Sequence, residues 1–465
     1  MAFSIIVCTP EHLSDPDLAI AAARAGEIGL LNLGPGQSAT AWRVALARLA
    51  RQAPRGSGWG VRWDGWVHAR RSVAAFDRAA SVGRLPILLL AGVDPAGLAE
   101  RLVWARERAE RVLFEALDAD AARAAAGAGY DGVVLKGNEA GGRVGSDSSF
   151  LLLQSLRGGA GAPVWVQGAW GVDTVGAARV AGADGVVLAE ELWLARESPF
   201  AEADRALFAR LDGTESIALD DGEIHLRLFR QRDRETITAA QEELVRGGRP
   251  WDGLRDRLSD RSADGPSPLP LGQGIALARR LAERYETTGT MLDAFRTAAE
   301  RLPREAARRE TLAPASPLAR AHGTRYPIVQ GPMTRVSDRA GFIEAVADNG
   351  ALPFLALALM RGPEARRVLD ETRERLGRRP WGVGILGFVP PELRREQLEV
   401  IRDVRPPFAL IAGGRPSQAV ALEGDGIATY LHVPSPGLLA TFLDEGARRF
   451  VFEGRECGGH VGPRS

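Results

Sequence analysis

The residues best suited to chemistry lie in the glycine-rich segment Glu456-Cys-Gly-Gly-His-Val-Gly462. Histidine has the side chain whose unperturbed pKa lies nearest neutrality, so His460 could abstract a proton from a substrate. Gly458 and Gly459 leave room for a ligand beside the imidazole ring. The alternative interpretation is a glycine-rich loop that carries an incidental surface histidine.

A second candidate segment, Gln330-Gly-Pro-Met333, follows a short apolar run. The amide of Gln330 could contact the edge of a heterocycle, Gly331 lets the backbone approach a flat ligand, and Pro332 stiffens the turn. An ordinary turn between a strand and a helix explains the same residues. Weaker candidates are Gly413, in Ala412-Gly-Gly-Arg-Pro416, and His432, at the end of a predicted strand.

Other kinds of site are not expected. Cys8 and Cys457 are the only cysteines, they form no CxxC pair, and nothing near them in sequence would stabilise a thiolate. No spacing typical of metal ligands and no GxSxG motif occurs, so we predict neither a metal site nor a serine nucleophile. The histidines His12, His68, His225 and His322 show no metal-ligand spacing with one another.

The elements that must position these residues are short apolar runs that alternate with amphipathic stretches, the pattern of parallel βαβ units. Eight such runs predict a (β/α)8 barrel over residues 1–195, with any active site at the carboxyl ends of its strands. An open doubly wound sheet is the competing α/β fold, but no GxGxxG follows the first run. The predicted strands are Ser4–Cys8, Gly29–Leu33, Trp59–Trp63, Pro86–Leu90, Val112–Ala116, Gly132–Lys136, Val164–Gln167 and Gly185–Leu188.

The pattern changes after the eighth run. Residues 196–322 contain stretches rich in proline, glycine and aspartate, together with helical patterns at Ile275–Tyr285 and Met291–Arg301. This segment is predicted to be a small helical cap and linker.

An internal repeat begins at about residue 323. Pro10 aligns with Pro332, and Trp59-Gly-Val61 with Trp381-Gly-Val383, each pair 322 residues apart. A near-constant offset indicates a duplicated domain. The predicted strands of the second copy, residues 323–465, are Tyr326–Gln330, Leu352–Leu355, Trp381–Leu386, Phe408–Ala412, Ile427–His432 and Phe450–Glu453. Six strands cannot close an eight-stranded barrel, so we expect a truncated second barrel. We favour a chain cut from a longer polypeptide; the alternative is a second copy that is structurally incomplete.

Composition restricts the function further. The 465 residues include 59 Lys plus Arg and 59 Asp plus Glu, a balance that gives no bulk attraction to nucleic acids or to membrane surfaces. No signal peptide and no apolar run long enough to span a membrane is evident, so we expect a cytoplasmic protein.

The combination of Gln330–Met333 with Glu456–Gly462 resembles the nitronate monooxygenase (2-nitropropane dioxygenase) family. That family includes flavin-dependent enoyl-acyl carrier protein reductases, and the longer context is similar to duplicated barrels at the amino terminus of bacterial polyketide synthases. The resemblance implies FMN at the barrel mouth, with NAD(P)H as an optional reductant, and His460 in the catalytic position. The cofactor-binding positions implied by it are Gln330, Gly331, Pro332, Met333, Gly458 and Gly459. Gly384 stands where the family often has asparagine, which weakens the flavin contact, and Gly413 is a further cofactor-binding candidate that could pack near the flavin ring.

The first copy departs from the family pattern. Cys8-Thr-Pro-Glu11 replaces the Gln-Gly-Pro-Met turn, and Arg143 replaces the histidine. Glu190 stands where the family has a phosphate-binding glycine followed by serine or threonine, so a carboxylate would face the FMN phosphate. We therefore expect the first barrel not to bind FMN in the family manner.

The resulting prediction is an FMN-dependent oxidoreductase, a monooxygenase or an enoyl reductase, forming one module of a polyketide or fatty acid synthase. Its partners would be a small-molecule or acyl-carrier-bound substrate and downstream synthase domains. The alternative is a catalytically inactive barrel scaffold or docking region of that synthase. A third hypothesis is a different small anion in the first barrel.

Overall fold

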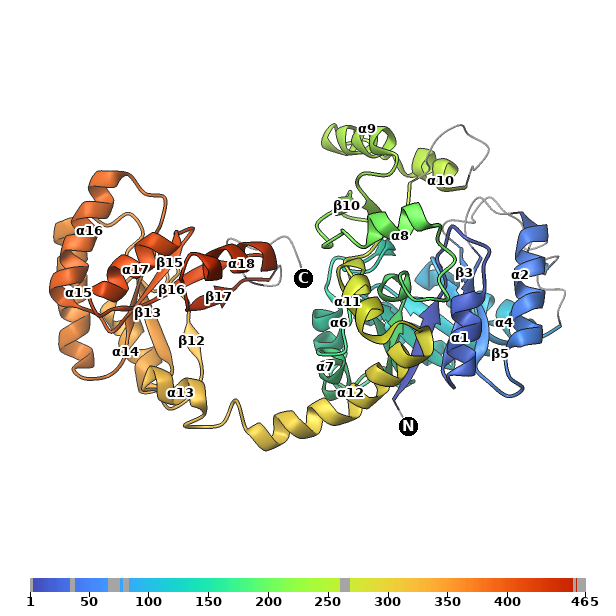
Figure 1. Ribbon diagram of the computed structural model, residues 1–465, viewed down its shortest axis with the longest axis horizontal. Helices are drawn as coiled ribbons and strands as arrows, with labels where there is room; N and C mark the ends of the chain where they lie inside the picture. Colours follow the sequence, from blue (N-terminus) through green and yellow to red (C-terminus); the bar gives the residue numbers. More distant parts are fainter. Residues whose placement is uncertain are drawn as a thin grey trace. The chain divides into compact units, whose positions relative to one another are not determined.

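The computed structural model describes residues 3–33, 38–65, 76–77, 83–259, 268–454 and 457. The chain divides into two compact units, Met1–Arg304 and Glu305–Ser465 (Figure 1). Among the described residues, no helix combines the length and the apolar character needed to cross a membrane.

The first unit contains a closed barrel of eight parallel strands in the order β1-β2-β3-β4-β5-β6-β8-β9, which confirms the predicted fold. The barrel closes where β1 pairs with β9, beginning at Ser4 and Gly185. The strands are β1 Ser4–Cys8, β2 Ile28–Asn32, β3 Trp59–Asp64, β4 Leu85–Ala91, β5 Ala109–Ala116, β6 Gly132–Lys136, β8 Val164–Gln167 and β9 Gly185–Leu188.

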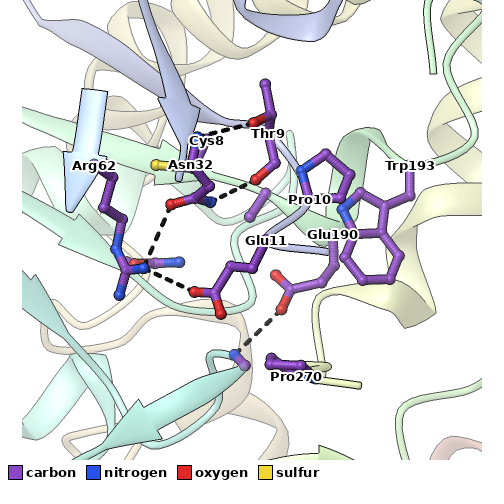
Figure 2. A pocket seen from close by; sticks show the side chains of 12 residues that line it. Cys8, Thr9, Pro10, Glu11, Asn32, Arg62, Glu190, Trp193 and Pro270 are labelled. Atoms are coloured by element: carbon purple, nitrogen blue, oxygen red, sulfur yellow. Dashed lines mark hydrogen bonds and ion pairs between the residues drawn. The ribbon is translucent and has the colours of Figure 1, made fainter. Parts of the chain in front are cut away.

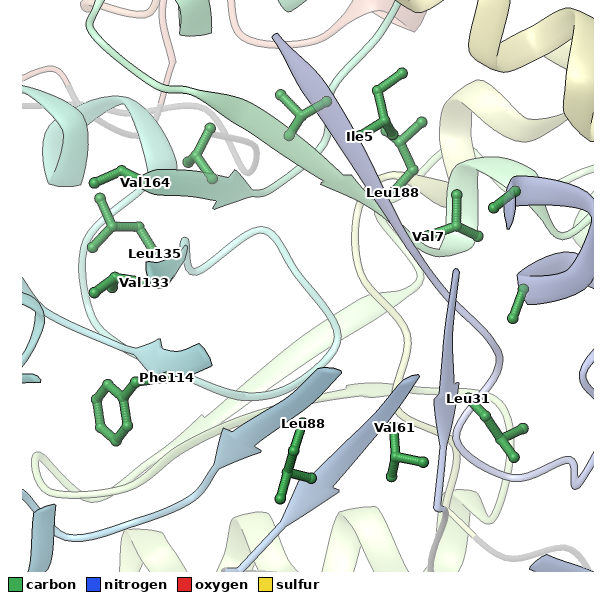
Figure 3. Close-up of a cluster of buried hydrophobic side chains, with 14 of the residues drawn as sticks. Ile5, Val7, Leu31, Val61, Leu88, Phe114, Val133, Leu135, Val164 and Leu188 are labelled. Carbon is green, nitrogen blue, oxygen red and sulfur yellow. The ribbon is translucent and has the colours of Figure 1, made fainter. Parts of the chain in front are cut away.

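Side chains on these strands alternate between two apolar cores. Ile5 and Val7 of β1 point outward and pack with the surrounding helices (Figure 3), whereas Ile6 points into the barrel. Because both faces of each strand are buried, the strands are continuous apolar runs in the sequence. The helical elements between them are α1 Asp17–Arg24, α2 Ala39–Gln52, η1 Pro95–Gly97, α4 Leu98–Arg106, α5 Ala119–Ala128, α6 Ser149–Ser155, α7 Val175–Val180 and η2 Glu190–Leu192.

Local sequence sets the ends of these helices. The hydroxyl of Ser38 accepts from the Ala41 amide at 3.1 Å, and the carboxylate of Asp118 accepts from the Ala121 amide at 2.7 Å. Both are N-cap interactions that satisfy amides left free in the first turn. Gly129 ends α5 with a positive φ of 96°, a conformation that glycine adopts without strain.

The segment after the barrel contains two strands that the sequence analysis did not predict. They pair antiparallel with a short strand from the loop after β6, in the order β10-β11-β7. The alternation of Ile217 with Leu219, and of Leu226 with Leu228, was the available signal, but the helical patterns on either side dominated the prediction. The elements are β7 Gly142–Val144, α8 Glu202–Phe208, β10 Ser216–Asp220, β11 His225–Phe229, α9 Arg234–Val245 and α10 Trp251–Ser259.

Two further helices, α11 Ile275–Tyr285 and α12 Thr288–Arg309, include the two helices predicted within the linker. Met291, Leu292 and Phe295 of α12 are fully buried and belong to the same core as the outward side chains of the barrel strands. This part of α12 therefore packs on the barrel like the helices between its strands.

The second unit contains a six-stranded parallel sheet among its described residues, with the strand order of β1 to β6 repeated, as the internal repeat predicts. Its strands are β12 Val329–Gln330, β13 Leu352–Ala356, β14 Gly382–Leu386, β15 Phe408–Ala412, β16 Ala428–Val433 and β17 Phe450–Phe452. Its helices are α13 Pro317–His322, α14 Ala340–Asp348, α15 Gly362–Leu376, α16 Pro391–Val404, α17 Pro416–Gly424 and α18 Pro436–Asp444. Prolines open four of these helices, where the missing amide hydrogen costs nothing.

Candidate functional site

The predicted cofactor-binding residues that the structure describes lie at one edge of the second unit's sheet. Gln330 ends β12 and is followed by Gly331–Met333, Gly384 lies in β14, and Gly413 follows β15 directly. The carboxyl ends of parallel strands lie on the same side of a sheet, so the turns after β12 and β15 share that side, with β13 and β14 between them. The predicted residues Gly458, Gly459 and His460 lie outside the described residues, so their roles stay predictions.

Hydrogen bonds within the unit fix the turn after β12. The Gln330 side-chain oxygen accepts from the Phe354 amide at 3.1 Å, and its side-chain nitrogen donates to the Gly331 carbonyl. The Met333 amide donates to the buried hydroxyl of Ser337 at 2.8 Å. Gln330 therefore anchors the turn to the neighbouring strand, while the Met333 side chain is 52% exposed at the sheet edge.

Gly384 has a steric role in this turn. A Cβ atom on Gly384 would lie 2.1 Å from Cβ of Pro332, so the proline ring fills the space of a side chain. The resemblance to the flavin family treated Gly384 as a weakened flavin contact. In the structure it is the residue that lets the turn after β12 lie against β14.

An exposed aromatic residue stands beside Gly413. Gly413 has a positive φ of 63°, and a Cβ there would lie 2.8 Å from the ring of Phe388. Phe388 follows β14 and is 65% exposed. Sequence reasoning did not single out Phe388, although an aromatic side chain in a loop at the carboxyl end of a strand is the available signal.

A titratable pair lies at the same edge. Nδ1 of His432, on β16, is 3.3 Å from a carboxylate oxygen of Glu453, just after β17, and both side chains are mostly buried. His432 was a weaker candidate in the sequence, and Glu453 was not one. The pair could hold or relay a proton beside a bound ligand.

The first unit has a polar layer at the carboxyl end of its barrel. Arg62 of β3 points inward and binds Glu115 of β5 through two hydrogen bonds of 2.8 Å. It also donates to Glu11 at 2.8 Å, and Lys136 of β6 lies 3.6 Å from Glu115. Burial favours protonated Glu115, but Arg62 and Lys136 outweigh it and hold its pKa at about 2. This network fills the position where a barrel enzyme keeps its ligand.

The space left above this layer is small. The cavity has a volume of about 30 Å³, and Figure 2 shows Glu11, Asn32, Arg62, Glu190 and Pro270 around it. One water needs at least roughly 10–15 Å³ of such volume, and a pocket for an organic ligand takes roughly 300–1,000 Å³. The first barrel therefore has no room for a flavin at its mouth.

Three residues that mark the first copy as divergent have structural roles. Burial raises the pKa of the Cys8 thiol to about 12, so it stays protonated at neutral pH. Arg143, which replaces the family histidine, lies in β7 and pairs with Leu226 of β11. The Glu190 carboxylate accepts from the backbone amides of Gly141 at 3.2 Å and Gly272 at 2.8 Å. Within the described residues, no three His, Cys, Asp or Glu side chains are grouped to hold a metal ion.

Comparison with known proteins supports the fold. No protein-family model and no curated protein matches the sequence. Among solved structures, FabK from Thermotoga maritima is 18% identical and superposes with a TM-score of 0.53, over 66% of this chain and 96% of its own. Over the matched two thirds, this chain shares the fold of FabK. At this identity the similarity establishes the architecture and not the chemistry.

Two other similar structures have lower TM-scores. Nitroalkane oxidase from Streptomyces ansochromogenes is 20% identical, with a TM-score of 0.48 over 65% of this chain and 97% of its own. The enoyl reductase domain of MlnA from the macrolactin biosynthesis cluster of Bacillus amyloliquefaciens is 7% identical, with a TM-score of 0.46 over 66% of this chain and 97% of its own.

Proposed function

We propose that this chain is an FMN-dependent oxidoreductase module whose flavin site lies at the carboxyl edge of the second unit's sheet. The observation that carries the proposal is that Gln330–Met333 and Gly413 follow strands at the carboxyl side of one sheet, with Gly384 against Pro332 and exposed Phe388 beside Gly413. The resemblance to the nitronate monooxygenase family, which rests on the same residues, supports it.

The residues at this edge fit one side of a flavin ring. No described atom lies within 4 Å of the Cβ position of Gly331, so the backbone there is open to a flat ligand. Met333 and Phe388 add exposed apolar surface for ring contact. In the family, the loops that grip the phosphate follow strands seven and eight, whereas the residues named here would contact the flavin ring.

When bound, FMN would supply hydride transfer to or from the substrate. In the proposed enzyme His460 removes or positions a proton, and His432 with Glu453 provides a second proton-holding group at the edge. The proposed substrate is a nitronate with dioxygen as the oxidant, or an enoyl group on a carrier with NAD(P)H as the reductant. The proposed setting is the cytoplasm, as a module with downstream polyketide or fatty acid synthase domains.

The second candidate function is an inactive barrel scaffold within such a synthase. The 30 Å³ cavity of the first barrel and its Arg62–Glu115 network favour that role for the first unit. Under the leading proposal the first unit does not catalyse.

The catalytic assignment is tested by turnover of nitronate and of an enoyl thioester with NAD(P)H, in the presence of FMN. The His460→Ala variant should lose activity by roughly 10²- to 10⁴-fold, the usual contribution of a general base. His225→Ala, in the first unit, is the matched control and should keep activity. Full turnover in His460→Ala would refute the role of His460, and no turnover of either substrate by the unmodified chain would favour the scaffold.

A further inference from the structure

The first barrel carries an anion of its own at the position where a ligand's anionic group would bind. Glu190 lies directly after Ala189 at the carboxyl end of β9, and its side chain is buried. One carboxylate oxygen accepts from the Gly141 and Gly272 amides, at 3.2 Å and 2.8 Å. Hydrogen bonds to an ionised acceptor are about twice as strong as those between neutral groups.

The two amide donors are built for close approach to this oxygen. A Cβ atom on Gly141 would lie 2.5 Å from it, and a Cβ atom on Gly272 would lie 2.9 Å from it. Any larger residue at either position would therefore push the carboxylate away. Glycine lets both backbones approach the anion closely.

The Gly272 amide belongs to a segment that we call the strap, residues Leu269–Gln273. The Phe229 amide donates to the Leu269 carbonyl at 2.8 Å, and the Gln273 amide donates to the Glu139 carbonyl at 2.7 Å. Pro270 of the strap lines the small cavity together with Glu190 (Figure 2). The strap thus forms part of the barrel mouth, and Glu190 joins it both to β9 and to the loop that holds Gly141.

The neighbouring carboxyl group is consistent with a charged Glu190. Burial, followed by the charge of Glu190, raises the pKa of Glu191 to about 8. FMN does not fit here, because its phosphate would meet a buried carboxylate that already has its partners.

We propose that the Glu190 carboxylate occupies the two-amide site that a phosphate group would need, and that it thereby holds the strap at the mouth of the first barrel. The carboxylate satisfies both amides without any ligand. Removing the carboxylate should free the two amides for a small external anion. This inference concerns the first unit and does not depend on flavin binding by the second.

Hydrogen exchange of the full chain, measured by mass spectrometry on peptides covering the strap, tests the proposal. In Glu190→Ala, exchange in the strap should become faster by an order of magnitude or more, as expected for the loss of two charge-assisted hydrogen bonds. Sodium acetate or inorganic phosphate should slow it again in this variant, whereas sodium chloride at equal ionic strength should not. The matched control is Glu191→Gln, which keeps the carboxylate of Glu190 and should leave strap exchange unchanged.

The outcomes that overturn the proposal are distinct. Wild-type exchange in Glu190→Ala would show that the carboxylate does not hold the strap. Acceleration that neither acetate nor phosphate reverses would refute the anion site. If Glu190→Ala does not fold, Glu190→Gln is decisive, because it keeps an acceptor oxygen without the charge. Strap exchange faster than in the wild type supports the proposal, and strap exchange equal to the wild type overturns it.

Discussion

The ring of Pro332 occupies the space that a side chain on Gly384 would need, with 2.1 Å between Cβ of the proline and the Cβ position of the glycine. Gly384→Ala should therefore destabilise the second unit by about 1–3 kcal/mol through overpacking. Urea dependence of hydrogen exchange in peptides from β13 and β14 would measure the change. Gly331→Ala is the matched control, because space around its Cβ position is open and its φ is not positive. Equal stability of the two variants would contradict the packing described here.

The buried network of the first barrel should be sensitive to the loss of its cation. Arg62→Met leaves Glu115, only 5% exposed, without its bidentate partner. Breaking a buried ion pair in this way costs about 3–5 kcal/mol. Tryptophan fluorescence during urea unfolding reports on the first unit, because every tryptophan except Trp381 lies there.

The control for this change is Arg196→Ala, which removes an exposed pair with Glu286 in the same unit. Such surface pairs contribute about 0–1 kcal/mol. A stable Arg62→Met variant would mean that the network does not hold the barrel mouth together.

The stability of the first unit should fall as the pH rises from about 5 to about 8. Burial raises the pKa of Glu191 from its ordinary 4.5 to about 8, so the folded state binds more protons than the unfolded state in this interval. Glu191→Gln mimics the protonated form and should remove that part of the pH dependence. The difference in unfolding free energy between variant and wild type, measured at several pH values, checks this. A difference that is constant between pH 5 and pH 8 would refute the assignment.

The second unit should lose stability as the pH falls below about 6.5. His322, at the end of α13, shares a 2.7 Å hydrogen bond with the Tyr430 hydroxyl, and burial lowers its pKa below the ordinary 6.5. The unfolded chain therefore takes up a proton that the folded unit resists, so stability decreases from pH 6.5 down to the folded pKa. His322→Gln should flatten this dependence, as followed by exchange in peptides of β15 and β16. An unchanged pH profile in the variant would contradict it.

The strands were predictable because burial on both faces makes them continuous apolar runs, and β1, β6, β8 and β9 match the predicted ranges. The charged layer was harder to predict from the sequence, although Arg62 and Glu115 interrupt these apolar runs at positions that face into the barrel. Contacts between distant segments left no local signal: Glu190 meets amides 49 and 82 residues away. In the same way, the sequence around Gly384 does not show that a glycine is required there, because the constraint comes from the ring of Pro332.

The placement of the flavin site in the second unit is tested most directly by titrating the full chain with FMN and following flavin absorbance. We expect one FMN per chain, with binding abolished in Gly331→Trp, whose side chain would extend into open space at the sheet edge. Glu11→Gln, at the mouth of the first barrel, should leave binding unchanged. Failure of the chain to bind FMN, or binding that survives Gly331→Trp and is lost in Glu11→Gln, would contradict the proposed site.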